Sequence, residues 1–212
     1  MKQKRLEAIC SFLSIEDKVI DIGCDHAYVP IYMAKKGTQK LLATDIHPNA
    51  LNVAKENIVK NHLEEVIQTS LSDGLDEVDT TGYDTIVIAG MGANTILNIL
   101  DNKPKLVPIK KIILQANNDL EHLRFMMMKQ HFYLEKECIL KDKNHYYTVM
   151  CYKKGEQTLS EEELFLGLYD KHYKEYYLFL KKKYMDILKK SKNEDIKRKL
   201  KYVLNYLYKE NG

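Results

Sequence analysis

The amino-acid sequence predicts an α/β fold, in which a mostly parallel sheet is covered by helices on both faces and is followed by a helical hairpin. Short apolar runs alternate with amphipathic stretches through residue 153, which is the pattern of strands joined by crossover helices. Two β-rich segments then follow one another across a short turn, and this indicates an antiparallel edge. Beyond a polar linker the chain contains long amphipathic segments, which is typical of paired helices.

The first half of the chain contains an opening helix and then alternating strands and helices. Apolar residues at spacings of three and four mark one face of the opening helix, at Leu6, Ile9, Cys10 and Leu13. Pro48 stands at a position favoured in the first turn of a helix. The elements expected next are strands at 18–22, 41–45 and 65–69 and helices at 31–36 and 48–60.

The second half completes a seven-stranded sheet. Two further strands are expected at 84–89 and 111–115, with helices at 94–100 and 120–130. The segments 132–140 and 145–152 are predicted to form an antiparallel hairpin at one sheet edge, because the residues between them are typical of a turn.

The polar linker 153–158 divides the chain into a predicted catalytic domain, 1–157, and a C-terminal domain, 158–212. Two apolar seams separated by the break at 191–195 predict an antiparallel coiled-coil hairpin. The first seam contains Leu166, Tyr169, Tyr173, Tyr176, Leu180, Tyr184 and Ile187, and the second contains Ile196, Leu200, Val203 and Leu207. Eight of the 15 tyrosines lie in this region; they could pack in the seam or stack on nucleic-acid bases.

Composition indicates an ordinary globular protein, with 45% hydrophobic and 30% charged residues among 212. No apolar run approaches the roughly 20 residues that span a bilayer, and no signal-peptide pattern is present, so a cytoplasmic protein without a membrane partner is expected. The four scattered cysteines suggest free thiols and no metal site. Residues 159–212 carry 13 Lys and Arg against 9 Asp and Glu, and this basic balance suggests a polyanionic partner or a solvated helix face.

Polar residues or glycines follow each of the five expected parallel strands. In such sheets ligands bind beyond the carboxyl ends of the strands, so these residues are expected to meet. They are Asp21, Gly23, Asp25 and His26 after the first strand, Asp45 after the second, Ser72, Asp73 and Gly74 after the third, Gly90 to Gly92 after the fourth, and Gln115, Asn117 and Asn118 after the fifth.

These residues favour a cationic nucleoside ligand over a dinucleotide. A dinucleotide fingerprint would need glycines at positions 25 and 28, where the chain has Asp25 and Tyr28, and a carboxylate there would repel a pyrophosphate. S-adenosylmethionine suits the acidic set. Asp21 and Asp25 can face its ammonium group, Asp45 can accept from the ribose hydroxyls, and Asp73 can accept from the adenine amino group.

The motifs DIGCDHAYVP at 21–30, TDI at 44–46, SDGL at 72–75, IAGMG at 88–92 and LQANN at 114–118 resemble the bacterial tRNA (adenine-22 N1)-methyltransferase family, TrmK, over the whole chain. One departure is Ala116, where many relatives are expected to have proline. The resemblance implies a Rossmann-like class I methyltransferase fold. It also implies methyl transfer from S-adenosylmethionine to N1 of adenosine 22 in the D-arm region of tRNA.

The expected cofactor and catalytic residues follow from these motifs, and the expected tRNA-binding residues are the basic residues of the C-terminal tail. The cofactor set is Asp21, Gly23, Cys24, Asp25, His26, Asp45, Ile46, Ser72, Asp73, Gly74, Ala89 and Gly90. The catalytic set is Asp25, His26, Tyr28, Gly90, Met91, Gly92 and Asn117. The tRNA-binding set is Lys181, Lys182, Lys183, Lys189, Lys190, Lys197, Arg198, Lys199 and Lys201.

No general base is expected, because N1 of a neutral adenine already carries a lone pair in the ring plane. Enzymes that methylate exocyclic amines place an Asn/Asp-Pro-Pro-aromatic motif after the fourth strand, and this chain has Gly90-Met91-Gly92 there. Two other readings stay open at this point: a methyltransferase for small molecules, and a nucleotide-binding adaptor that docks a protein partner through its helical hairpin. A monomer is expected.

Overall fold

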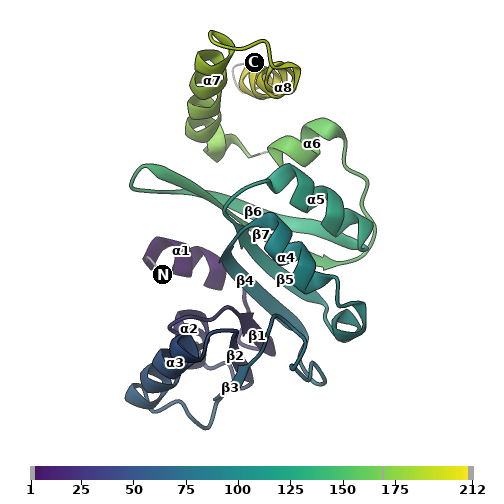
Figure 1. The fold of residues 1–212 in the computed structure, drawn as a ribbon. Helices are drawn as coiled ribbons and strands as arrows, with labels where there is room; N and C mark the ends of the chain where they lie inside the picture. The colour runs from purple at the N-terminus through teal and green to yellow at the C-terminus, as the bar shows by residue number, and fades with distance from the viewer. Residues whose placement is uncertain (1–2, 169, 210–212) are drawn as a thin grey trace.

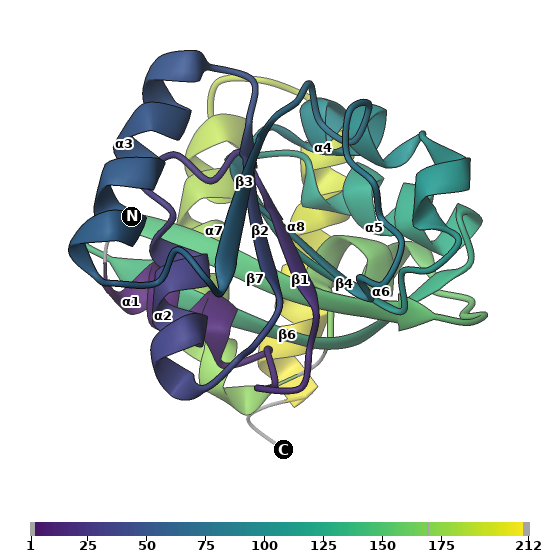
Figure 2. The ribbon, with the colours of Figure 1, turned by 90° about the horizontal axis from the view of Figure 1, so that it is seen from below.

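The computed structural model describes residues 3–168 and 170–209 and shows a seven-stranded sheet between two layers of helices (Figures 1 and 2). The strand order is β3-β2-β1-β4-β5-β7-β6. Strands β1 to β5 are parallel, and β7 and β6 form the antiparallel edge. The predicted doubly wound α/β architecture is therefore confirmed. The elements are β1 (Val19–Ile22), β2 (Leu41–Asp45), β3 (Ile67–Leu71), β4 (Thr85–Met91), β5 (Lys111–Ala116), β6 (Phe132–Asp142) and β7 (His145–Lys154).

Alternating side chains of the strands supply the two cores. One face packs against α1 (Gln3–Cys10), α2 (Tyr28–Lys36) and α3 (Pro48–Lys60), and the other packs against α4 (Ala93–Leu100) and α5 (Leu120–Lys129). In β1, for example, Val19 belongs to the first core and Ile20 to the second, because successive strand residues point to opposite faces. Figure 2 shows these two layers on either side of the sheet.

Several element boundaries differ from the sequence-based prediction. Helix α2 begins at Tyr28, three residues earlier than expected, and β4 extends to Met91 through an irregular register after Ala89. The β6–β7 hairpin pairs as far as Asp142 and His145, so its turn holds only Lys143 and Asn144. Lys143 adopts a left-handed φ of 55°, which a two-residue hairpin loop favours.

The C-terminal region is more divided than the apolar seam predicts. Instead of one helix from Leu166 onward, the chain forms α6 (Glu161–Leu166), a 3₁₀ turn (Lys171–Tyr173), α7 (Lys174–Leu188) and α8 (Glu194–Lys209). Gly167 ends α6 with a φ of 80°. The two long helices pack as a hairpin around a core in which Tyr177 and Tyr206 are the most buried aromatics. The predicted seam used Tyr176, which lies at the edge of this core, and Tyr169 lies outside the described residues.

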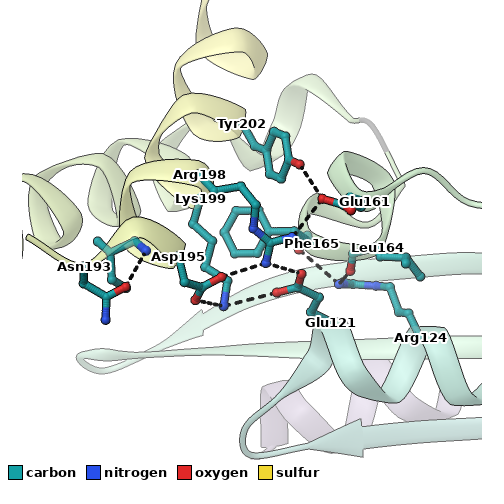
Figure 3. Close-up of polar contacts among 11 residues, drawn as sticks. Glu121, Arg124, Glu161, Leu164, Phe165, Asn193, Asp195, Arg198, Lys199 and Tyr202 are labelled. Atoms are coloured by element: carbon teal, nitrogen blue, oxygen red, sulfur yellow. Dashed lines mark hydrogen bonds and ion pairs between the residues drawn. The ribbon is translucent and has the colours of Figure 1, made fainter.

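A buried ion pair fastens this region to the α/β body. Arg124 of α5 and Glu137 of β6 meet at 3.0 Å with side chains 2% and 0% exposed. Arg124 also donates to the carbonyls of Leu164 and Phe165 in α6, at 2.9 and 3.2 Å, and the first of these contacts is drawn in Figure 3. Glu137 accepts from the backbone N–H of Leu168 at 2.9 Å. Because these groups satisfy a buried charge pair, the segment after α6 is held firmly to the sheet edge.

Within the described residues no helix is long and apolar enough to cross a membrane. The four cysteines are free.

Candidate functional site

The strand order reverses between β1 and β4, and a cleft of about 810 Å³ opens at the carboxyl edge of the sheet there. This volume lies within the range of roughly 300–1,000 Å³ found for small-molecule sites. Asp21, Asp25, Asp45 and Asp73 all line it, although they come from three different strand ends. The sequence predicted that these four carboxylates lie close together, and in the structure they line one cleft.

The loop between β1 and α2 owes its shape to three left-handed residues. Gly23, Asp25 and Ala27 have φ values of 72°, 51° and 56°. The φ of Gly23 favours glycine, and an added Cβ would also force the methyl carbon of Met91 to move. Aspartate is one of the residues that tolerate this conformation, and Asp25 can therefore turn the chain where a dinucleotide loop would use glycine.

Asp45 is held in place by backbone donors. Its Oδ2 accepts from the N–H of Asp25 at 3.1 Å, and its Oδ1 accepts from the N–H of His47 at 2.9 Å. The residue is 6% exposed. Each carboxylate oxygen keeps a further lone pair, so both oxygens can still accept from a diol in the cleft.

Asp21 is a buried carboxyl inside β1, only 5% exposed. Burial, followed by the nearby charge of Asp45, raises the pKa of Asp21 to about 7. Burial also raises the pKa of the neighbouring Cys24 thiol, so Cys24 stays protonated. A cation entering the cleft would favour the charged form of Asp21.

The Gly90–Gly92 segment is braced by the loop after β5. Asn117 donates from Nδ2 to the Gly90 carbonyl at 2.8 Å, and its backbone N–H donates to the Met91 carbonyl at 2.8 Å. Asn118 Oδ1 accepts from the N–H of Ala93 at 3.0 Å and so satisfies a free donor at the start of α4. Gln115, fully buried, donates to Asn117 Oδ1 at 3.1 Å. These amides position the segment.

Two aromatic rings stack on one another in and after the loop that follows β1, and one of them, Tyr28, lines the cleft. The rings of His26 and Tyr28 stack with centroids 5.1 Å apart and planes 25° apart. His26 Nε2 lies 3.5 Å from Asp25 Oδ2. Tyr28 is 38% exposed, which leaves part of its ring open to a ligand.

The cleft contains most of the residues expected from the sequence. Every residue of the expected cofactor set lines it except His26. Of the expected catalytic set, Asp25, Tyr28, Gly90 and Met91 line it, while His26, Gly92 and Asn117 are not among its lining residues.

Sequence reasoning missed several lining residues because it considered only strand ends. Thr95, Asn98 and Ile99 face the cleft from α4, and their spacing of three and four could have indicated one helix face. Asp76 follows the Asp73-Gly74 turn, and His47 follows Asp45 by two residues. Arg5 reaches the cleft from α1, and no local motif in the sequence indicates that it lies there.

The expected tRNA-binding residues separate into two groups. Arg198 and Lys199 of α8 form ion pairs with Glu121 of α5 at 2.8 and 3.1 Å and with Asp195 at 2.7 and 2.9 Å (Figure 3). Lys197 also pairs with Glu194 within α8, and Lys189, just after α7, pairs with Asp186 of α7. In the described part of the chain the remaining expected residues, Lys181, Lys182, Lys183, Lys190 and Lys201, form no ion pair. Because the α8 charges fasten α8 to α5, the free positive charge lies mainly on α7.

The described residues include no group of three or more His, Cys, Asp or Glu side chains that could hold a metal ion. The cleft instead fits a cationic nucleoside. It offers a buried carboxyl whose pKa is raised, a carboxylate with two free lone pairs, and an exposed apolar wall at Ile46.

Comparison with known proteins agrees with this site. A methyltransferase-domain family model matches residues 2–150. The chain is 30% identical over 166 residues to the tRNA (adenine(22)-N(1))-methyltransferase of Bacillus subtilis, covering 77% of this chain and 70% of that protein.

Solved structures give the same result. A Streptococcus pneumoniae protein in complex with S-adenosyl-L-methionine is 27% identical with a TM-score of 0.90, and the match covers 98% of this chain and 100% of that one. M. capricolum TrmK in complex with S-adenosyl-homocysteine is 26% identical with a TM-score of 0.86 and 98% coverage of both chains. With a sheet-edge cleft built for a cationic nucleoside and these relatives along nearly its full length, the chain belongs to the tRNA (adenine-22 N1)-methyltransferase family, TrmK.

Proposed function

We propose that the chain transfers the methyl group of S-adenosylmethionine to N1 of adenosine 22 in the D-arm region of tRNA. The observation that carries this proposal is the gathering of Asp21, Asp25, Asp45 and Asp73 in one cleft at the switch point of the sheet. Such a cleft favours a cationic nucleoside over a pyrophosphate. The family membership of the chain supplies the target base.

Each aspartate has a role that its position supports. Asp73, which follows β3, and Ile46, which follows β2, would hold the adenine ring. Asp45, at the end of β2, would accept from the ribose hydroxyls. Asp21 and Asp25, from β1 and the loop after it, would face the ammonium and sulfonium charges. Charge-assisted hydrogen bonds of this kind contribute about 1.5–3 kcal/mol each.

The chain's own part in the reaction is positioning. The bound cofactor supplies an activated methyl group on its sulfonium. Adenine N1 attacks without prior deprotonation, so no side chain needs to act as a base. The braced Gly90–Gly92 segment fixes the wall beside the transfer path, and Asn117 keeps that wall in place through the Gly90 carbonyl. Holding two reactants in line accounts for much of the acceleration in such reactions.

The stacked pair of His26 and Tyr28 is suited to receive the target base at the rim. Tyr28 offers an open ring face for stacking, and Asp25, next to His26, can accept from the adenine amino group. A stacked or paired adenosine must first be turned out of its helix, which costs a few kcal/mol, so a large tRNA contact surface is needed.

That surface is proposed to run from the cleft to α7. The hairpin tip contacts α7 through Lys141 and Glu175 at 2.5 Å and through the rings of Tyr146 and Phe179 at 5.2 Å. The tip, α1 and the start of α7 lie on the same side of the molecule (Figure 1). The free lysines of α7 would then extend this contact surface, and residues 158–212 would act as the tRNA-contacting extension of the catalytic unit 1–157.

The proposal is tested with an unmodified tRNA transcript, labelled cofactor and mapping of the methylated base. One methyl group at N1 of position 22 is expected, and a transcript with guanosine at that position serves as the matched control. A methyl group at another position, or equal labelling of the control, would contradict the assignment.

The same assay separates the alternatives. A methyltransferase for small molecules would label nucleosides or metabolites and ignore tRNA, and an adaptor would bind the cofactor weakly or not at all and label nothing. The reaction is expected in the cytoplasm, and sedimentation of the active enzyme is expected to show a monomer.

A further inference from the structure

We infer that Gln115 is a positioning residue for methyl transfer, which acts through the side chain of Asn117 on the Gly90 carbonyl at the wall of the cleft. The inference rests on the proposed function and deepens it, because it gives a role in the reaction to a side chain outside the cleft. Gln115 is fully buried at the end of β5 and is not among the lining residues.

Gly90 is an extra residue in the pairing of β4 with β5. Ala89 and Met91 are paired with consecutive residues of β5, so Gly90 between them is left over, as in a β-bulge. Its φ is 85°, and it lines the cleft. The extra residue of a bulge is left out of the hydrogen-bond ladder, so its carbonyl needs a partner from elsewhere. The Asn117 side chain supplies that partner at 2.8 Å.

The Gly90 carbonyl fixes the direction of both side-chain amides. A carbonyl can only accept, so Asn117 must present its Nδ2 to Gly90 and its Oδ1 to Gln115. Gln115 must then present its Nε2, which donates to Asn117 Oδ1 at 3.1 Å. Asn117 is exposed, and the bond from Gln115 keeps its amide from turning toward water. The orientation of the exposed amide is therefore set by the buried one.

Gln115 is an expensive choice for packing alone. Its side chain is fully buried, and its Oε1 accepts no hydrogen bond from any residue that the structure describes. A buried polar atom without a partner is destabilising, and in folded proteins such an atom calls for an explanation, of which a role in catalysis is one. An apolar side chain of the same length would avoid this cost. The part of Gln115 that serves the site is the Nε2 donor aimed at Asn117.

A structural role would be to hold the loop after β5. That loop has other anchors, because the Asn117 N–H donates to the Met91 carbonyl at 2.8 Å and Asn118 Oδ1 accepts from the Ala93 N–H at 3.0 Å. A structural role predicts that loss of the Gln115 amide lowers stability. A positioning role predicts that the same loss lowers turnover and leaves stability unchanged or higher.

The test combines steady-state methylation of an unmodified tRNA transcript with urea unfolding and calorimetry of S-adenosylhomocysteine, all on the full chain. Gln115→Met keeps the length of the side chain and removes the amide. Asn117→Ala and the double variant complete a double-mutant cycle. Gln130→Met is the matched control, since Gln130 also has a buried amide oxygen without a partner among the described residues but does not line the cleft.

Gln115→Met is expected to lower kcat about 10-fold, because a small misplacement at a reacting centre is costly. The KM for tRNA and the Kd for S-adenosylhomocysteine should stay within about twofold of wild type, which is the pattern of an interaction that matters only in the transition state. The urea midpoint should equal or exceed that of wild type. In the Asn117→Ala background the same substitution should change kcat less than about twofold, because the relay is already cut. Gln130→Met should leave kcat unchanged.

Two results would overturn the inference. One is an unchanged kcat, or a fall in kcat that comes with a lower urea midpoint, since Gln115 would then only support the fold. The other is independent losses that add in the double variant, since Gln115 would then not act through Asn117. A wild-type chain that binds S-adenosylhomocysteine but methylates no tRNA would instead contradict the proposed function, and this outcome is seen before any variant is compared.

Discussion

Replacing Asp21 with asparagine should stabilise the unliganded protein at alkaline pH. The carboxyl is buried, and its pKa is raised from 3.8 to about 7, first by burial and then by the charge of Asp45. Because the pKa in the folded state lies above that in the unfolded state, the fold favours the protonated form. The stability that Asp21 contributes is therefore fully present below about pH 4 and is lost as the pH rises through 7.

The size of the loss follows from the same values. A rise from 3.8 to about 7 corresponds to about 4 kcal/mol at about 1.4 kcal/mol per pH unit. An asparagine side chain at this position would be uncharged at every pH and of nearly the same shape. Relative to wild type, the free energy of unfolding of Asp21→Asn should therefore be higher at pH 8 than at pH 4 by up to about 4 kcal/mol.

Urea unfolding of both proteins at several pH values between 4 and 8 measures this difference. Asp73→Asn, which removes an exposed carboxylate of the same cleft, provides the baseline. Calorimetry should show the opposite effect on function, since the variant lacks the negative charge that faces the ligand ammonium. A stability difference that does not change with pH, or one that favours the wild type at pH 8, would refute the account of Asp21 as a carboxyl whose ionisation opposes folding.

Further expectations concern the ribose contact, the buried ion pair and the tRNA surface. Asp45→Ala should weaken S-adenosylhomocysteine binding at least about 10-fold in calorimetry, because it removes acceptors for two hydroxyls; a change below twofold would move the ribose elsewhere. Gly167→Ala should lower the free energy of unfolding by more than about 2 kcal/mol, because its Cβ would press on Glu137 and Arg124. Gly37→Ala is the control, because Gly37 also has a positive φ but has open space around it, so this variant measures the backbone cost alone. Equal losses of unfolding free energy for the two variants in urea titrations would disprove the clash. Replacing Lys181, Lys182 and Lys183 together with glutamine should raise the KM for tRNA severalfold and weaken its salt dependence without altering cofactor affinity, whereas Lys201→Gln on α8 should have a smaller effect. Truncation after residue 158 should destabilise the whole chain in thermal unfolding, since it strips the buried Arg124–Glu137 pair of its partners in and after α6; a truncated protein that unfolds at the wild-type temperature would contradict this.

The strand-end residues were predictable because their positions follow from local pattern. Apolar runs fix where each parallel strand ends, and parallel strands all end at one edge of the sheet. Asp21, Asp45 and Asp73 could therefore be assigned to one site before any distance was known. The left-handed φ of 51° at Asp25, in contrast, was not predicted and is known only from the structure.

The same local reasoning was less accurate in the C-terminal region. A seam of apolar residues every three or four positions continues through Leu166 and suggests one helix, but Gly167 interrupts it. The buried pair of Arg124 and Glu137, which is distant in sequence, forms hydrogen bonds with backbone groups on both sides of that glycine, the Leu164 carbonyl and the Leu168 N–H. These bonds hold the chain in a non-helical path at Gly167. Periodicity contains no information about a partner from another element.

The sequence by itself determined the sheet, its antiparallel edge and the acidic character of the ligand site, because each follows from short-range spacing and from which strand end a residue occupies. Only the tertiary structure decided which charges remain available. It pairs Arg198 and Lys199 with Glu121, and it leaves the lysines of α7 free. It also brings Arg5 from the first helix into the cleft beside Tyr147 of the last strand. Whether a charge is neutralised depends on groups within a few ångströms in space, and these come from segments that lie far apart in the sequence, such as Arg198 and Glu121, which are 77 positions apart.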